Sequence, residues 1–102
     1  MHSPEWYEKR DIDEFLAAIG TYNVKPTTGG FGSSGTSDRI CCYKGRFFSV
    51  EVKRPGLNGK RNPEPTALQW KRMAEVEAAG GTAFWGTAAK VIPEIKAWLA
   101  NL

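Results

Sequence analysis

The amino-terminal fifth of the chain carries the amphipathic pattern of a helix. Ser3 and Pro4 suit the N-cap and the first helical position, and Gly20 suits the end of the helix. Helical spacing places Glu5 and Glu8 on the same face as the apolar side chains, so two carboxylates are expected on the inward side of this helix. Apolar side chains recur every three or four residues, at Ile12, Phe15, Leu16 and Ile19.

Two further helices are predicted in the second half of the chain. Thr66 and Gln69 have the spacing of a capping box, and the helix that they open ends at Gly80-Gly81. Its apolar stripe is Trp70, Met73, Ala74 and Ala78. Pro93 begins the last helix or lies early in it. One face of that helix carries Ile92, Ile95, Leu99 and Leu102.

Segments rich in β-branched and aromatic residues lie between these helices and predict strands. Residues 21–26 form a short strand or an extended edge, and residues 39–43, 46–53 and 82–86 form the others. A turn at Lys44-Gly45 joins the two central strands in a hairpin. The expected order is α-β-β-β-α-β-α. We expect one α/β domain of 102 residues.

The hairpin brings three charged side chains to one end of the sheet. Side chains alternate along a strand, so Glu51 and Lys53 share one face, roughly 7 Å apart. The turn folds Asp38 back beside Glu51. Two carboxylates and an ammonium can hold a divalent metal and activate a water. Glu-x-Lys alone is also common on a solvated strand face with a weak ion pair, so the surrounding sequence decides its weight.

The charge distribution indicates a polyanionic partner. The formal net charge is +3, but residues 44–72 hold eight basic side chains against Glu51 and Glu64, whereas residues 1–20 are acidic. Such a concentration of positive charge beside a carboxylate pair suits nucleic acid. A basic surface without a partner has the same composition, which leaves that alternative open.

Several chemistries and locations are disfavoured by the composition. Cys41 and Cys42 are adjacent, so they point to opposite faces of a strand and are expected as reduced thiols. His2 is the only histidine, which argues against a histidine-based hydrolase. No apolar run reaches about 18 residues and no signal segment opens the chain, so an intracellular protein is expected.

Two loops flank the charged residues. Residues 27–37 form a Gly/Ser/Thr loop that leads into Asp38, and either a phosphate chain passes close to its backbone or it is a plain connector. Residues 55–65 form a polar loop that is expected to be mobile and to close over a ligand.

Four segments of the sequence resemble the VRR-NUC domain of the PD-(D/E)xK nuclease superfamily. They are Gly35-Thr36-Ser37-Asp38, the run from Gly45 through Arg46-Phe47-Phe48 and Glu51-Val52-Lys53-Arg54-Pro55-Gly56, Pro65-Thr66-Ala67-Leu68-Gln69, and Gly80-Gly81. The match spans nearly the whole chain and resembles the stand-alone form carried by phages and prophages. It implies a restriction-endonuclease-like core, with a small central mixed sheet flanked by helices.

This sequence departs from the family pattern at two positions. Ser37 stands where the superfamily usually has a proline before its metal-binding aspartate. Lys9 stands where the family tends to place a glutamate of the first helix. The resemblance therefore leaves open whether Glu5 or Glu8 joins the site.

The resemblance implies a Mg²⁺- or Mn²⁺-dependent DNA endonuclease. Asp38, Glu51 and the backbone carbonyl of Val52 would bind the metal. Lys53 would position a water or stabilise the charge that builds on the phosphate, and Gln69 would orient Lys53 or that water. Phosphate contacts, which position DNA without specifying its sequence, would come from Lys44, Arg46, Arg54, Lys60, Arg61, Lys71 and Arg72.

The family resemblance also suggests a substrate and an assembly. Branched DNA such as a four-way junction offers two symmetry-related strands, which a homodimer with two sites would match. Exposed aromatics among Trp6, Tyr7, Trp85 and Trp98 would serve the dimer contact, although core packing is the commoner fate of such residues. A phage- or prophage-encoded protein acting in a bacterial cytoplasm is implied, with no membrane and no organic cofactor.

Three alternatives remain at this stage. The chain is a DNA-binding module without catalysis, a non-specific or restriction-type nuclease, or a small α/β domain whose charges are surface decoration. No helix rich in Arg, Asn and Gln is available for reading bases, which disfavours a restriction-type enzyme.

Overall fold

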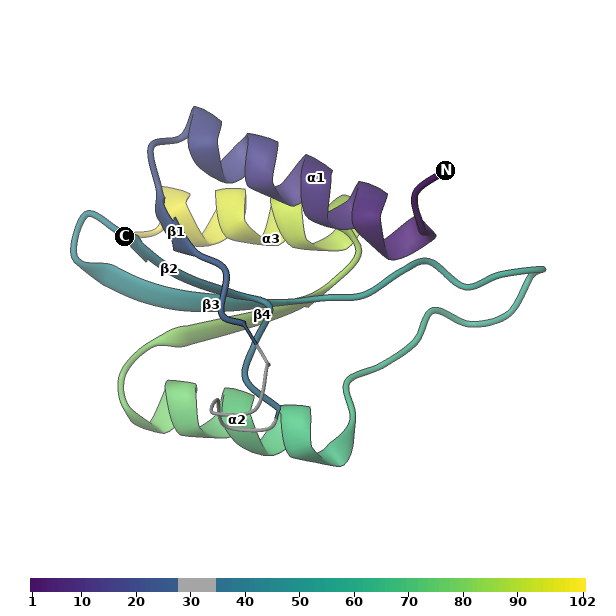
Figure 1. Cartoon of the computed structure of the whole chain (residues 1–102). Coiled ribbons are helices and arrows are strands. Elements are labelled where there is room, and N and C mark those ends of the chain that lie inside the picture. The colour runs from purple at the N-terminus through teal and green to yellow at the C-terminus, as the bar shows by residue number, and fades with distance from the viewer. Residues whose placement is uncertain (28–34) are drawn as a thin grey trace.

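The computed structural model describes residues 1–27 and 35–102. A mixed sheet has helices on both faces, with α1 (Pro4–Ala18) and α3 (Ala88–Ala100) on one and α2 (Ala67–Ala78) on the other (Figure 1). Its strands β1 (Tyr22–Val24), β2 (Arg39–Tyr43), β3 (Arg46–Val52) and β4 (Thr82–Gly86) lie in sequence order. The predicted α/β fold class and the order α-β-β-β-α-β-α are confirmed.

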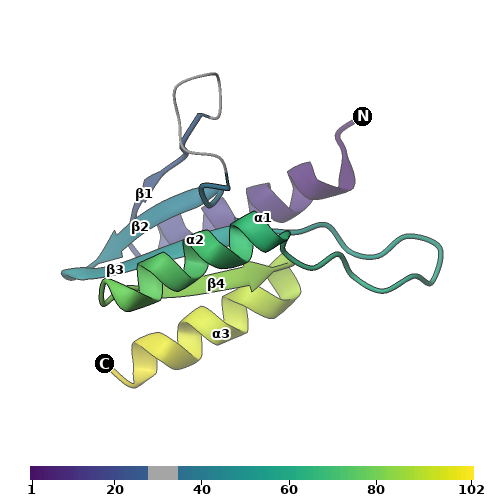
Figure 2. The same cartoon turned by 90° about the horizontal axis from the view of Figure 1, so that it is seen from below.

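The crossover from β3 through α2 to β4 decides where the ends of the elements meet. β3 and β4 are parallel, so both finish at the same end of the sheet, at Val52 and Gly86. We call this the carboxyl end. All three helices begin there, as two perpendicular views show (Figures 1 and 2). Each helix N-terminus contributes a partial positive charge, so this end of the molecule favours anions.

The hydrophobic core lies between the sheet and the layer formed by α1 and α3. Phe48 packs edge-on against Phe84 and Trp98, with ring centroids 5.9 and 5.3 Å apart. The opposite face of the sheet contributes less to the core, because Met73 is the buried residue of α2. The fully buried apolar side chains are Ile12, Leu16, Phe48, Val50, Val52, Val91 and Ile95.

The predicted apolar stripe of α2 is wrong except at Met73. Trp70 is 45% exposed, and Ala74 and Ala78 are exposed as well. The physical reason is that α2 covers β3 and β4 alone, so a narrow line of contact is enough.

The last helix begins five residues before Pro93, at Ala88. Its buried face includes Val91 and Ile95, whereas Leu102 follows the helix and is half exposed. The prediction for Leu102 is wrong because the helix ends at Ala100, before that residue can complete the stripe.

The hairpin turn sets the register on which the candidate site depends. Lys44 and Gly45 have φ angles of 47° and 81°, which suit the tight two-residue turns of β-hairpins. Arg39 pairs with Val50 across the hairpin. The next residues outward, Asp38 and Glu51, therefore lie opposite each other at the carboxyl end.

Other sequence-based expectations concern the helix caps and the thiols. The Ser3 hydroxyl accepts a hydrogen bond from the Trp6 amide at 3.2 Å, and the capping box of Thr66 and Gln69 is present. Cys41 and Cys42 are free, and burial raises the pKa of the Cys41 thiol to about 12. Across residues 1–27 and 35–102, no helix combines the length and the apolar composition needed to cross a membrane.

Candidate functional site

Asp38 and Glu51 form a carboxylate pair at the carboxyl end of the sheet. Asp38 Oδ2 accepts a hydrogen bond from the Val52 amide at 2.9 Å, which aims its side chain across the hairpin. Glu51 is 4% exposed, and its Oε1 accepts from Gln69 Nε2 at 2.9 Å. Glu51 Oε2 is buried and has no hydrogen-bond donor among the described residues.

The pair is electrostatically strained in the absence of a cation. Burial, and then the neighbouring charge and carboxyl of Asp38, raise the pKa of Glu51 to about 8, although Lys53 opposes the shift. At neutral pH Glu51 therefore ionises less readily than an ordinary carboxyl group. A divalent cation that prefers oxygen ligands would remove this conflict and would supply the partner that Oε2 lacks.

Few side chains of the described residues are placed to bind a metal ion here. Within the described parts of the chain, no group of three or more His, Cys, Asp or Glu side chains converges as a metal cluster. Two carboxylates therefore need oxygen donors from the backbone, the substrate or water, as is common for Mg²⁺. The residues present fit such a cation.

Gln69 connects the carboxylate pair to Lys53. Its Oε1 accepts from Lys53 Nζ at 2.8 Å and from the Thr66 amide at 2.9 Å, while its Nε2 reaches Glu51. The capping box thus holds the amide that orients both charged groups. One conformation of the Gln69 side chain therefore serves both the cap of α2 and the contacts to Glu51 and Lys53.

The first helix brings Lys9 and Glu5, rather than Glu8, to the site. Lys9 Nζ lies 3.6 Å from Asp38 Oδ1 and 3.3 Å from Glu5 Oε2. Glu8 instead accepts a hydrogen bond from the Ala88 amide at 2.8 Å, so it caps α3. An ammonium therefore occupies the position beside Asp38 where the family resemblance suggested an acid.

Sequence reasoning missed Asp13 and Arg39, which tie α1 to the strand that carries Asp38. Arg39 is 7% exposed and donates to both carboxylate oxygens of Asp13, at 2.7 and 2.9 Å. Its Nη1 donates to the Asp38 carbonyl at 2.7 Å. Burial alone would raise the pKa of Asp13, but hydrogen bonds from Arg39 and Asn23 hold it below its usual range. An arginine at the start of an apolar strand was the available signal.

The basic residues predicted to contact DNA divide into two groups. Arg54 follows Lys53 directly, Lys60 and Arg61 are exposed on the loop after β3, and Lys71 and Arg72 lie in the first half of α2. Lys44 and Arg46 lie at the opposite end of β3, about 20 Å away at 3.3 Å per residue. Lys44 and Arg46 are close to Glu51 in sequence, but a hairpin turn lies at the far end of its strands, so they are distant from the carboxylate pair in space.

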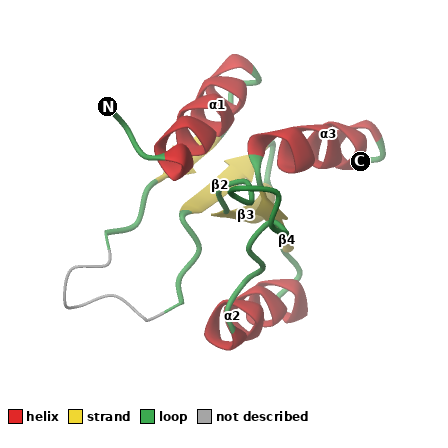
Figure 3. Cartoon of the chain, turned by 90° about the vertical axis from the view of Figure 1, so that its right-hand side faces the viewer, coloured by secondary structure: helices red, strands yellow, loops and turns green. Residues whose placement is uncertain are grey.

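The loops are placed in part. Gly35 packs so closely on α2 that an added Cβ would lie 2.7 Å from Leu68 Cγ, which guides the chain into Asp38. The rest of the predicted phosphate-contacting loop, residues 28–34, lies outside the described residues. The loop after β3 projects from the carboxyl end (Figure 1), onto which Figure 3 looks directly, and Asn62 Oδ1 accepts from the Gly56 amide at 2.7 Å.

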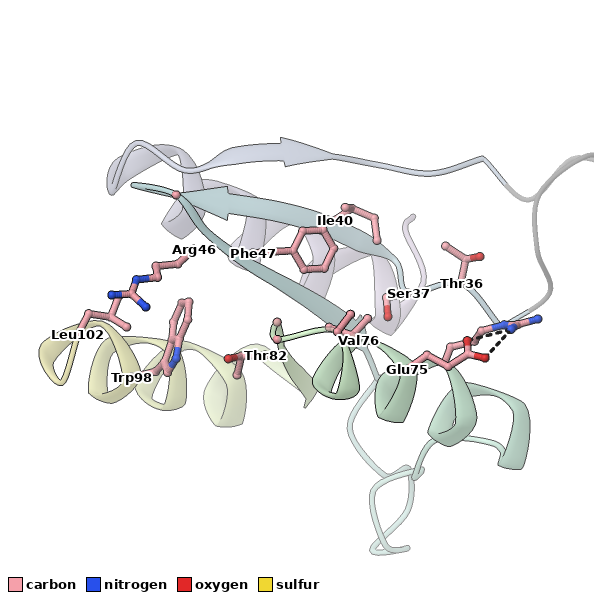
Figure 4. A pocket seen from close by; sticks show the side chains of 15 residues that line it. Thr36, Ser37, Ile40, Arg46, Phe47, Glu75, Val76, Thr82, Trp98 and Leu102 are labelled. Carbon is pink, nitrogen blue, oxygen red and sulfur yellow. Dashed lines mark hydrogen bonds and ion pairs between the residues drawn. The ribbon is translucent and has the colours of Figure 1, made fainter.

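One cavity lies apart from the carboxylate pair. It is an open groove of about 700 Å³ between the sheet and the second half of α2, floored by Ile40, Phe47 and Val76 (Figure 4). Its apolar lining suits a protein contact better than phosphate chemistry.

Comparison with solved structures identifies the fold. A structure described as a VRR_NUC domain superposes with a TM-score of 0.71 at 24% sequence identity. The match covers 93% of this chain and 97% of that one. No family model and no curated protein matches the sequence. The chain therefore has the fold of a VRR_NUC domain.

Glu51→Gln is expected to stabilise the metal-free protein in alkaline solution. A raised pKa means that the stability from Glu51 is fully present below about pH 4.5 and is lost as the pH rises through about 8. Glutamine carries no charge, so its melting temperature near pH 8.5 should exceed the native value by about 4 °C or more. The measurement is thermal unfolding in EDTA at acidic and alkaline pH, with the exposed Glu75→Gln as the control. A gain that is equal at both pH values would contradict this assignment.

Arg39→Ala is expected to cost about 1.5–3 kcal/mol of unfolding free energy, because Asp13 keeps Asn23 and Lys25 but loses its charge-assisted hydrogen bonds from Arg39. Urea denaturation measures the loss. Arg10→Ala, which removes an exposed ion pair with Asp11, should change stability by about 0.5 kcal/mol or less. Similar losses in the two variants would show that the Asp13–Arg39 pair is not a structural tie.

Proposed function

We propose that this chain is a metal-dependent nuclease that hydrolyses phosphodiester bonds in DNA. The observation that carries the proposal is the pairing of half-buried Asp38 with buried Glu51, one oxygen of which lacks a partner, beside the ammonium of Lys53. Sharing a fold with a VRR_NUC domain supports the same reaction class.

Each residue of the pair and its surroundings has a role in this proposal. Asp38, Glu51 and the backbone carbonyl of Val52 hold Mg²⁺ or Mn²⁺. The ion lowers the pKa of a bound water and neutralises charge on the phosphate. Lys53 is held by Gln69 at one N–H, which leaves its other two donors for the attacking water or a phosphate oxygen.

Lys9 and Glu5 take a different part from that of a metal-binding acid. The Lys9 ammonium balances the Asp38 charge, and Glu5 in turn holds Lys9. Glu8 acts through the fold, since its carboxylate caps α3 at the same end of the sheet.

DNA contacts the carboxyl end, where cationic side chains and three helix N-termini gather. Arg54, Lys60, Arg61, Lys71 and Arg72 lie around this end and would contact phosphates of the strand that is cut. Lys44 and Arg46 would reach only DNA that extends along the sheet. These contacts carry no sequence information, so selectivity comes from the shape of the DNA.

We further propose branched DNA as the substrate and a homodimer as the active form. A four-way junction presents two symmetry-related strands, and a chain with one carboxylate pair cuts both as a dimer. The sheet face beyond α2 exposes apolar side chains that a second copy would cover. Tyr22 is 70% exposed, Val24 39% and Phe47 43%.

The aromatics named from the sequence are less suited to this contact. Trp98 packs on Phe48 in the core, and Trp85 is half-buried beside Trp70. Trp6 and Tyr7 are partly exposed but are stacked with His2 and Arg10. Action inside a bacterial cell, from a phage or prophage gene, remains part of the proposal. So does the single-domain organisation.

Purified protein is expected to cut DNA with Mg²⁺ or Mn²⁺ and to lose that activity in EDTA. Asp38→Ala and Lys53→Ala should each reduce the cleavage rate by at least about 10²-fold, the loss typical of a removed electrostatic contact, while DNA binding persists. Glu14→Ala, which removes an exposed carboxylate of α1, is the surface control. The assay compares linear duplex, single strand, flap and four-way junction.

The outcomes of that assay separate the alternatives. Faster cutting of the junction supports structure selectivity, and equal cutting of all forms identifies a non-specific nuclease. Binding without metal-dependent cleavage of any form would overturn the enzyme and leave a DNA-binding module.

The native protein is expected to be a dimer at micromolar concentration, measured by light scattering after size exclusion. Tyr22→Asp should shift it to a monomer, because a charge on this face would be buried without a partner. Tyr7→Asp, an exposed aromatic on α1, should leave the dimer intact. A monomeric native protein would sink the dimer proposal.

A further inference from the structure

A second pocket opens at the carboxyl end beside Lys53. Its volume is about 280 Å³, and its walls come from the start of α3, the end of β4 and the loop after β3. Lys53, Arg61 and Lys90 line it against one carboxylate, Glu64. Asp38, Glu51 and Gln69 are not part of its lining, so it is a neighbour of the carboxylate pair rather than the same cavity.

Lys90 is held in this pocket by contacts that leave one donor for a ligand. Its Nζ donates to the Trp85 carbonyl at 2.7 Å and lies 3.9 Å from the centre of the Trp85 ring. A second N–H points to Glu94, with Nζ 3.3 Å from Oε2. An ammonium has three donors, so the third is available in the pocket.

Gly86 makes this arrangement of Lys90 sterically feasible. Its φ angle is +136°, and an added Cβ would lie 2.7 Å from Lys90 Cδ. The aliphatic stem of Lys90 therefore crosses the backbone directly. Because the Gly86 carbonyl also accepts from the Lys53 amide at 2.9 Å, the two lysines are anchored on the same residue.

Thr87 places a hydroxyl beside the cations of this pocket. It is 8% exposed, lines the pocket and is the N-cap of α3, yet its hydroxyl makes no hydrogen bond within the described residues. The hydroxyl oxygen is not among the enclosed side-chain atoms that lack a partner, so it is accessible from the pocket. Glu8 accepts from the Ala88 amide, the first of α3, so one of the open amides at this helix start is satisfied from α1. The hydroxyl is left free for a group bound in the pocket.

We propose that this pocket is a phosphate subsite. Lys90 and Thr87 are its contacts, and Arg61 is a further cation at its rim. This assignment rests on the proposed function and deepens it: the subsite takes a phosphate adjacent to the phosphodiester that is cut. That phosphate belongs either to the interior of a strand or to a 5′ terminus. Glu64 and Glu94 now balance Arg61 and Lys90, and the phosphate would compete with them for these cations.

The test is a phosphate-by-phosphate scan of binding by the full chain. Fluorescent four-way junctions carry a neutral methylphosphonate at one position at a time near the branch, and affinity is measured in EDTA so that no cleavage occurs. For the native protein, one position should weaken binding about tenfold, the value of a charge-assisted hydrogen bond. In Lys90→Met the same substitution should cost less than about twofold.

Further variants and ends sharpen the assignment. Thr87→Val should reduce the same penalty, and Lys90→Arg should restore most of it. Lys96→Met is the matched control, since Lys96 also lies on α3 near an aromatic ring, that of Phe15, and lines neither pocket. Comparing 5′-phosphate with 5′-hydroxyl ends separates a terminal phosphate from an interior one.

The results distinguish this proposal from the one it rests on. Cleavage in Mg²⁺ together with identical scans for the native protein and Lys90→Met overturns the subsite and leaves the nuclease. A position-specific loss without any cleavage supports the subsite and overturns the enzyme. A lower melting temperature of Lys90→Met with an unchanged scan shows that Lys90 only packs on Trp85, and no DNA binding at all overturns both proposals.

Discussion

The structure depends on placing the half-buried carboxyl of Asp38 beside the buried carboxyl of Glu51 where the central hairpin ends. Folding buries Glu51 opposite Asp38, and burial first, then the neighbouring Asp38, raise the pKa of Glu51. The surrounding contacts prevent the pair from moving apart. The Val52 amide holds Asp38, the Gln69 amide holds Glu51, and Lys9 and Lys53 add positive charge on either side. These contacts hold the two carboxyl groups together against their mutual repulsion.

Residues that hold the carboxylate pair in place also stabilise the fold. Gln69 caps α2 and orients Lys53 with the same oxygen, so the helix cannot begin elsewhere without releasing the ammonium. Arg39 joins Asp13 of α1 to the backbone of Asp38. Since Arg39 is nearly inaccessible, this tie is little screened by solvent. The position of α1 and the position of Asp38 are therefore mechanically linked.

The asymmetry of the two sheet faces separates stability from binding. One face is covered by α1 and α3 and contains the buried core. The other is covered by α2 alone, and beyond it Tyr22, Val24 and Phe47 remain exposed. Charge is unevenly placed as well, because parallel β3 and β4 and all three helix N-termini meet at the carboxyl end (Figure 2). An anion is attracted to one end of the molecule, while an apolar partner would meet its side.

The local sequence determined the elements and the central juxtaposition, because both follow from short-range periodicity. The alternation of β3, the turn at Lys44-Gly45 and the capping box at Thr66 suffice to set Asp38 opposite Glu51 and to start α2 at its observed residue. Contacts between distant segments were decided only by tertiary packing. The Arg39–Asp13 pair and the capping of α3 by Glu8 join residues 26 and 80 positions apart. Such contacts depend on how helices cross the sheet, and the period of an amphipathic pattern carries no information about that crossing.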